Sequence, residues 1–276
     1  MSIYAERKID CHHHVIDPAR FPYAVDAAYR PAAQEIGTTA QFRAVMAAYG
    51  VQHALTVGPN SGYGNDNRCL LDAIANGEGR FKGVAVVPED MGIDALARLQ
   101  QQGIVGIAFN ATYHGVAHYA GIGPLLGRLA ELGLFAQVQV EGDQLVGLAE
   151  LLEHSGVRLL IDHCGRPVPE AGFGQAGFRT LLGLAESQRA WVKLSGYAKF
   201  SRAAWPYPDA QPYARALVAA FTLERCLWGS DWPFLRASER IDYGPLLVLV
   251  EQLVPDPRDR DQLLWKTPGE LFGFAG

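Results

Sequence analysis

The sequence has few cysteines, no excess of basic residues and no long apolar run. Its 276 residues include four cysteines, none of them in a C-x-x-C pair, so neither a zinc ribbon nor a thioredoxin-like redox site is indicated. We expect buried, reduced thiols. Lysine and arginine number 24 against 29 acidic residues, giving a net charge of −5. This balance argues against nucleic acid or an anionic membrane as the main partner, because both need a basic surface.

Signals for membranes and secretion are also missing. No apolar run approaches the length of about 20 residues that spans a bilayer. The first ten residues, MSIYAERKID, lack the apolar core of a secretory signal. We therefore expect a soluble, cytoplasmic protein with a small-molecule substrate, and a homodimer is compatible with these features.

Short β-rich runs alternate with longer helical stretches along the whole chain. The strand-like runs are mostly continuous in Val, Ile and Leu, a pattern typical of parallel strands buried on both faces. They cover residues 8–15, 51–58, 81–87, 104–110, 134–140, 157–164, 191–196 and 225–231. Helical spacing is found in residues 67–76, 94–102, 123–132, 143–154, 176–188, 210–221, 243–253 and 258–264.

Eight strands alternating with helices predict a (β/α)8 TIM barrel, an α/β fold. We expect one domain over residues 1–276, with 258–264 as a short extra C-terminal helix. An open, doubly wound sheet is the alternative. It is weakened because no Gly-x-Gly-x-x-Gly motif follows an early strand.

In such a barrel the active site lies at the carboxyl ends of the strands, so polar residues at those ends are candidates. The first strand ends in three consecutive histidines. Alternate side chains of a strand share a face, so His12 and His14 point together and His13 points away. Two converging imidazoles can ligate a divalent metal or bind an anion. We interpret His13 as structural.

The sixth and eighth strands end in further candidates. His163 could supply a third nitrogen ligand or act as an electrophile, and Arg166 could grip a carboxylate through two hydrogen bonds. Asp231 lies between apolar residues and a Trp-Pro turn, where it could take a proton from an attacking water. The remaining polar residues near strand ends, each as compatible with a structural role as with substrate contact, are Asn110, Gln137, Gln139, Lys193, Ser195 and Lys199.

The order and spacing of these motifs resemble the amidohydrolase superfamily, and more closely its 2-pyrone-4,6-dicarboxylate lactonases. The likeness spans nearly the whole chain. It is carried by His12-His13-His14-Val15, Phe21-Pro22-Tyr23, Asp66-Asn67 and residues 106–110, 161–167, 227–233 and 268–274.

The resemblance implies a hydrolase that opens a lactone, a cyclic ester, in the degradation of aromatic compounds. It makes Asp231 the general base, places His12, His14 and His163 around the scissile carbonyl, and gives substrate contacts to Arg166 and Tyr23. Members of the superfamily usually bind zinc or a similar ion, here through His12, His14, His163 and Asp231. We expect one divalent ion, Zn or Mn, or none, because the pyrone lactonases work without one.

Two departures from the pyrone lactonases concern the substrate. Ala108 stands where they resemble one another in having an arginine for a carboxylate, and Gln139 stands where they tend to have a tyrosine. No lysine ends the fourth strand, so a two-metal site bridged by a carbamylated lysine is not expected.

Three alternative functions follow from the same residues. One is a decarboxylase of an unsaturated carboxylic acid, since related barrels with the same ligand set have that activity. A second is a sugar-acid (aldono-) lactonase, which Asn110, Gln137 and Ser195 would suit. The third is a barrel that binds a ligand without catalysis, in which the His and Asp residues would have no chemical role.

Overall fold

The computed structural model describes residues 2–25, 27, 29–60 and 62–274. The chain forms two compact units, unit 1 from Met1–Val86 with Leu227–Gly276 and unit 2 from Val87–Cys226. The sheet order is β1 to β8 in sequence order, and a helix lies between each successive pair of strands. This is the topology of a (β/α)8 barrel, so the predicted fold class is confirmed. The single-domain organisation stays a prediction.

The eight predicted strands are all present, but most end earlier than the sequence pattern suggests. The turns that follow them therefore carry the polar residues assigned to strand ends. The strands are β1 (Lys8–His13), β2 (Val51–Val57), β3 (Phe81–Ala85), β4 (Ile104–Asn110), β5 (Phe135–Gln139), β6 (Arg158–Ile161), β7 (Ala190–Leu194) and β8 (Cys226–Trp228).

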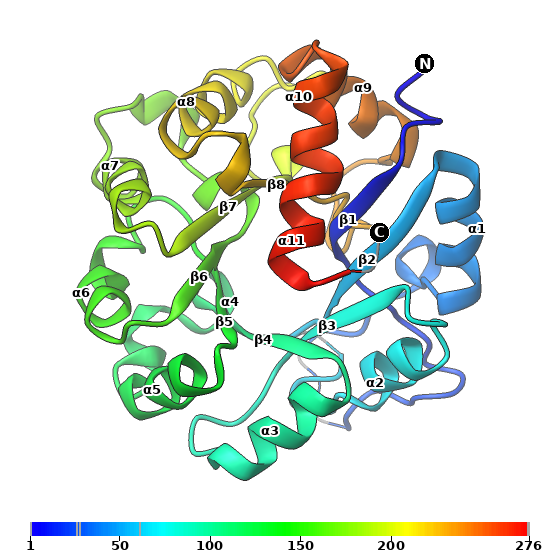
Figure 1. The fold of residues 1–276 in the computed structure, drawn as a ribbon, viewed down its shortest axis with the longest axis vertical. Coiled ribbons are helices and arrows are strands. Elements are labelled where there is room, and N and C mark those ends of the chain that lie inside the picture. Colours follow the sequence, from blue (N-terminus) through cyan, green and yellow to red (C-terminus); the bar gives the residue numbers. More distant parts are fainter. Residues whose placement is uncertain (1, 26, 28, 61, 275–276) are drawn as a thin grey trace. The chain divides into compact units, whose positions relative to one another are not determined.

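The predicted helices are present too, with shifts at their ends. They are α2 (Arg68–Ala75), α3 (Ile93–Gln101), α5 (Gly123–Leu132), α6 (Val146–His154), α7 (Ala176–Leu184), α8 (Gln211–Phe221) and α9 (Tyr243–Leu253), and a short α4 (Ala111–His114) follows β4. Figure 1 shows α5 to α8 of unit 2 outside strands β5 to β7. No helix of the described residues is long and apolar enough to cross a membrane.

Helix α1 (Thr39–Tyr49), which follows a long loop after β1, was not predicted. Its start is a capping box. The Thr38 hydroxyl accepts from the Gln41 N–H (3.3 Å), and the Gln41 side chain accepts from the Thr38 N–H (2.8 Å). The Thr-x-x-Gln spacing was therefore a readable signal for this helix.

The C-terminal helix is longer than residues 258–264. It consists of α10 (Pro257–Asp261), a π-helical turn (Gln262–Lys266) and α11 (Thr267–Phe272) without a break. Figure 1 shows this helix, in red, beside β1 and β2. The Lys82 ammonium group of β3 donates to the carbonyls of Phe272 and Gly273 and holds the end of α11 on the strands of unit 1.

Lys8 begins β1 with its side chain fully buried, at the end opposite to the candidate site residues. Its ammonium group donates to the backbone carbonyls of Glu6 and Tyr49. Burial lowers the pKa of Lys8 from 10.5 to about 8, because the charged form loses its hydration.

This lowered pKa predicts a specific dependence of stability on pH. Between pH 8 and 10.5 the unfolded chain keeps the Lys8 proton and the folded protein loses it, so the free energy of unfolding gains a term that rises with pH. The variant Lys8→Met lacks this term. Urea unfolding at several pH values should therefore show the wild type gaining stability relative to Lys8→Met across this range. A difference that does not change with pH would contradict the assignment.

Candidate active site

Three of the predicted site residues, His12, His14 and Asp231, come together in unit 1. The Oδ1 atom of Asp231 lies 3.6 Å from Nε2 of His12 and 3.4 Å from Nε2 of His14. The two imidazole centroids are 5.1 Å apart and nearly perpendicular, and all three side chains are buried. The prediction that His12 and His14 share a face is confirmed.

A backbone carbonyl fixes the proton position on His14. Its Nδ1 lies 2.8 Å from the carbonyl oxygen of Val57, at the end of β2. A carbonyl oxygen only accepts hydrogen bonds, so Nδ1 of His14 carries the hydrogen. In the neutral tautomer with this hydrogen the lone pair is on Nε2, where it can bind a cation held beside Asp231.

The backbone after β8 determines where Asp231 lies. The Asp231 N–H donates to the His12 carbonyl (2.7 Å), and the His14 N–H donates to the Trp232 carbonyl (2.8 Å), so the segment continues alongside β1 after β8 has ended. A Cβ atom on Gly229 would lie 2.6 Å from Cβ of His12, so only glycine allows this close approach. Asp231 itself has a left-handed backbone with φ of 63°.

Asp10, which the sequence analysis did not single out, joins these two segments. One carboxylate oxygen accepts from the backbone N–H groups of His12 (3.1 Å) and Ser230 (2.9 Å), and the other accepts from the Tyr243 hydroxyl (2.9 Å). Burial raises the pKa of Asp10 to about 6, against the opposing effect of these hydrogen bonds. A charged residue inside an apolar strand was the available signal.

His13 has the structural role expected of it. Its ring stacks on Phe42 of α1 at a centroid distance of 3.8 Å, and its Nε2 lies 3.1 Å from the Thr56 hydroxyl. Burial, with the neighbouring His14 and His12, lowers the pKa of His13 well below its usual value. The ring is therefore neutral and belongs to the core of unit 1.

In unit 2, the predicted residues His163 and Arg166 lie in an unusual turn after β6. Residues 163–166 all have positive φ, at 52°, 56°, 69° and 44°, although only Gly165 is a glycine. The left-handed region is unfavourable for residues with a side chain, and such strain is concentrated at functional sites. His163 was predicted to lie on a strand, and that prediction is wrong because β6 ends at Ile161 and His163 lies in this turn.

The His163 ring is held by the segment after β7. Its Nδ1 lies 2.9 Å from the Ser195 hydroxyl oxygen, and both residues are buried. Gly196 has φ of 64°, and a Cβ atom there would lie 2.5 Å from Nδ1 of His163. The Gly196 backbone therefore packs directly against the ring.

Lys193 takes part in a buried network on the strands of unit 2. Its ammonium group lies 3.1 Å from Asp162 and donates to the Gln137 side chain (2.6 Å), whose amide donates to Asp162 (2.9 Å). Each of the three side chains is at most 2% exposed. These contacts give Lys193 and Gln137 a structural role, and the predicted contact of Lys193 with substrate stays untested. Asp162, like Asp10, was missed.

The basic residues of the loops are more accessible. The Arg166 guanidinium lies 3.0 Å from the exposed Glu141 carboxylate and donates weakly to the Lys199 carbonyl (3.4 Å). Lys199 is half-buried. Both remain candidates for binding an anionic group.

The other predicted substrate contacts have partners within the protein. The Asn110 side chain accepts from the Tyr113 N–H (3.1 Å) and the Thr112 hydroxyl (2.7 Å), so it caps α4. The Gln139 amide donates to Thr112 (3.4 Å). In unit 1 the Tyr23 hydroxyl donates to the Pro31 carbonyl (2.7 Å).

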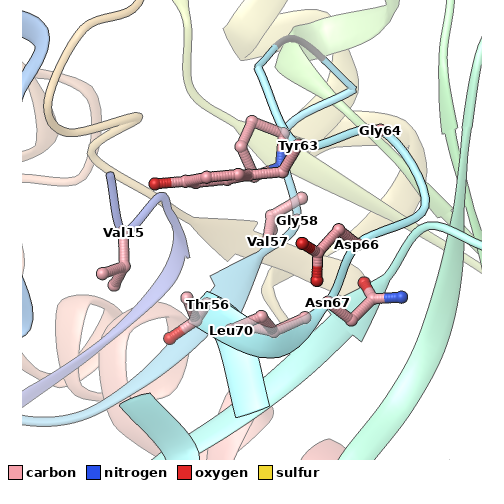
Figure 2. A pocket seen from close by; sticks show the side chains of 10 residues that line it. Val15, Thr56, Val57, Gly58, Tyr63, Gly64, Asp66, Asn67 and Leu70 are labelled. Carbon is pink, nitrogen blue, oxygen red and sulfur yellow. The ribbon is translucent and has the colours of Figure 1, made fainter. Parts of the chain in front are cut away.

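A pocket lies at the carboxyl end of β2, beside the carbonyl that holds His14 (Figure 2). Figure 2 shows the Tyr63 ring on one side and the polar ends of Asp66 and Asn67 on the other. Asp66 is paired with Arg68 (2.7 Å), and Asn67 exchanges hydrogen bonds with the Val86 backbone. The lining residues are Val15, Thr56, Val57, Gly58, Pro59, Tyr63, Gly64, Asp66, Asn67 and Leu70.

The donor set of unit 1 fits a divalent metal ion. One ligand atom from each of His12, His14 and Asp231 lies within 4.8 Å of the other two. Two imidazoles and a carboxylate are ligands that zinc and manganese accept, and the hydrogen bond of His14 to Val57 is the kind of second contact that orients a ligating histidine.

Comparison with known proteins identifies the family. Residues 9–274 match the profile of the Amidohydrolase family. The chain belongs to the amidohydrolase family. This amidohydrolase is 32% identical to the 4-sulfomuconolactone hydrolase of Rhizobium radiobacter, over 96% of its own length and 89% of the relative's. The predicted superfamily is confirmed.

Two further relatives of this amidohydrolase carry pyrone names. The 2-pyrone-4,6-dicarboxylate hydrolase of Comamonas testosteroni is 28% identical over 96% of this chain and 89% of that protein. A crystal structure of a probable 2-pyrone-4,6-dicarboxylic acid hydrolase from Acinetobacter baumannii, with citric acid bound, has a TM-score of 0.87 at 27% identity, covering 97% of this chain and 99% of that one.

The contacts of Asp10 predict that its carboxylate holds unit 1 together near the site. Asp10→Ala leaves three buried donors without their acceptor, so we expect a loss of about 3 kcal/mol or more in the free energy of unfolding, from about 1–3 kcal/mol for each group. Asp10→Asn keeps an acceptor of the same shape and should lose much less. Urea unfolding measures both, and equal stability of Asp10→Ala and the wild type would refute this role.

The donor set predicts that removal of one ligand weakens metal binding. We expect His14→Asn to bind Zn²⁺ at least about tenfold more weakly than the wild type, since even outer contacts of a metal ligand contribute about 10- to 100-fold. Competition with a chromophoric chelator measures the affinity. His154→Asn, at the exposed end of α6, is the matched control. Equal affinity of the two variants would exclude His14 as a ligand.

Proposed function

We propose that this protein hydrolyses a small lactone that carries an anionic group. The observation that carries the proposal is the buried Asp231 carboxylate between two imidazoles, in a chain similar to lactone hydrolases over most of its length. Hydrolysis of a cyclic ester needs a base for water and positive groups for the carbonyl oxygen. Asp231 provides the base, and an imidazole N–H, or a cation held by His12, His14 and Asp231, would provide the positive group.

In the proposed reaction Asp231 accepts a proton from water as the water oxygen attacks the ester carbonyl. The ring C–O bond then breaks, and the proton passes to the departing oxygen, so the product is an open-chain hydroxy acid. The Nε2 atoms of His12 and His14 lie 3.6 and 3.4 Å from the base. We propose that His163 takes part in the same reaction by polarising the carbonyl. When bound, a divalent ion would add Lewis-acid polarisation of that oxygen.

The proposed substrate follows from the basic residues. Ala108 of β4 pairs with Gln137 of β5, and neither side chain carries a positive charge that could bind a substrate carboxylate there. Arg166 and Lys199 are then the candidate anion contacts, with Glu141 as the partner that a substrate carboxylate or sulfonate would replace at Arg166. We therefore propose one anionic contact near Arg166 rather than the full set expected for a dicarboxylate.

The sugar-acid lactonase is the second candidate, and relatives of this chain include a D-galactarolactone isomerase at 24% identity. That function would use Asn110, Gln137 and Ser195 for substrate hydroxyls. Each of these side chains has hydrogen-bond partners within unit 2, which favours the anionic lactone. The decarboxylase alternative has less support because the similar proteins named above are hydrolases of a lactone and of a pyrone.

Replacement of the proposed base tests the function. Asp231→Asn should lower kcat by about a thousandfold, within the range of about 10²–10⁴ that a general base contributes, without unfolding the protein. The assay follows opening of 4-sulfomuconolactone, 2-pyrone-4,6-dicarboxylate and a neutral aldonolactone. The exposed Asp94→Asn of α3 is the control and should keep wild-type activity.

The outcomes separate the candidates. Turnover of an anionic lactone with loss in Asp231→Asn supports the proposal, whereas preference for the neutral aldonolactone supports the sugar-acid alternative. Near-normal activity of Asp231→Asn would exclude the proposed base. Release of carbon dioxide from an unsaturated acid, without lactone opening, would indicate the decarboxylase.

A further inference from the structure

Two of the predicted site histidines, His14 in unit 1 and His163 in unit 2, are held through Nδ1 by partners of different chemistry. The partner of His14 is the Val57 carbonyl, which can only accept. The partner of His163 is the Ser195 hydroxyl, which can donate or accept. The proton position on His163 therefore depends on which way the Ser195 hydroxyl points.

The surroundings of Ser195 decide that direction. The Ser195 side chain is 2% exposed, and among the residues that the structure describes Nδ1 of His163 is the hydrogen-bond partner of its hydroxyl. If the hydroxyl accepted from Nδ1, its own hydrogen would be buried without an acceptor, at a cost of about 1–3 kcal/mol. Donation to Nδ1 avoids that cost.

We propose that Ser195 is a positioning residue whose hydroxyl donates to Nδ1 of His163 and keeps the His163 hydrogen on Nε2. Gly196 completes the arrangement, because its backbone lies where a side chain would displace the ring. The left-handed turn at residues 163–166 presents the ring to this segment.

The two histidines then have opposite functions at Nε2. His14 presents a lone pair, suited to a cation or to the proton shared with Asp231. His163 presents an N–H, suited to a carbonyl oxygen that gains negative charge. His163 was predicted as one of four metal ligands, whereas a hydrogen on its Nε2 leaves His12, His14 and Asp231 as the ligands. The consequence for catalysis rests on the proposed function, whereas the proton position does not.

The proton position is measured directly by two-bond ¹H–¹⁵N correlation spectra of protein labelled with ¹⁵N at histidine. His163→Gln assigns the signals. The wild type should show His163 with hydrogen on Nε2 and an unprotonated Nδ1, and His14 with the opposite tautomer. In Ser195→Ala the His163 signals should shift toward a mixture of tautomers. A hydrogen on Nδ1 of His163 in the wild type would overturn the proposal, whatever the activity.

Kinetics test the catalytic consequence. Ser195→Ala should lower kcat about tenfold or more while KM changes less than about twofold, the size of effect expected for a side chain that orients a reactive group. Ser195→Thr keeps the hydroxyl and should recover most of the rate. Ser187→Ala is the matched control, since that hydroxyl also donates one hydrogen bond within unit 2, to the Leu184 carbonyl. Wild-type kcat in Ser195→Ala would refute the catalytic role.

Metal affinity gives a readout independent of turnover. Zn²⁺ binding measured with a chelator should be unchanged in Ser195→Ala and in His163→Gln, because His163 presents a hydrogen at Nε2. A loss of affinity in His163→Gln like that in His14→Asn would show that His163 is a ligand. If no lactone is opened by the wild type, the proposed function fails while the spectra and the metal titration still test the role of Ser195.

Discussion

The candidate site of unit 1 depends on one set of hydrogen bonds, those that keep residues 229–232 alongside β1 after β8 has ended. The regular strand stops at Trp228, and Asp231 has a backbone conformation that does not continue a strand. Two backbone hydrogen bonds and the Asp10 carboxylate take over from the regular ladder. Because the Asp10 carboxylate is buried and accepts from both segments, it couples the position of the proposed base to the strand that carries its imidazole neighbours.

How much of this could be predicted from the sequence depends on the range of the interaction. The facing of His12 and His14 follows from the alternation of side chains on a strand, so it was predicted and is confirmed. The fold class follows from the regular alternation of strands and helices. The Asp10 hydrogen bonds join residues more than two hundred positions apart, and no local pattern specifies them. Helix α1, by contrast, could have been predicted, because its capping box involves residues only three positions apart.

The turn at residues 163–166 shows a second limit of sequence patterns. An apolar run ending in Asp-His-Cys-Gly-Arg predicts a strand with polar residues at its end. Strand propensities do not predict several consecutive residues with left-handed backbone conformations. Tertiary contacts support that conformation. The Gly196 backbone and the Ser195 hydroxyl hold the ring of His163, and the Arg166 carbonyl accepts from the Gly142 N–H. Residues assigned to substrate contact, such as Asn110 and Lys193, likewise turned out to have protein partners that only the fold reveals.

The partners of the histidines also explain how similar side chains can have different chemistry. An imidazole is a donor or an acceptor at Nε2 according to what its Nδ1 contacts. A carbonyl such as that of Val57 only accepts, so a neutral histidine beside it has its hydrogen on Nδ1 and its lone pair on Nε2. A hydroxyl can either donate to Nδ1 or accept from it. When the hydroxyl is buried without a second acceptor, donation to Nδ1 is favoured. The backbone of β2 thus makes His14 suited to metal or proton, and a single serine after β7 makes His163 suited to an oxyanion.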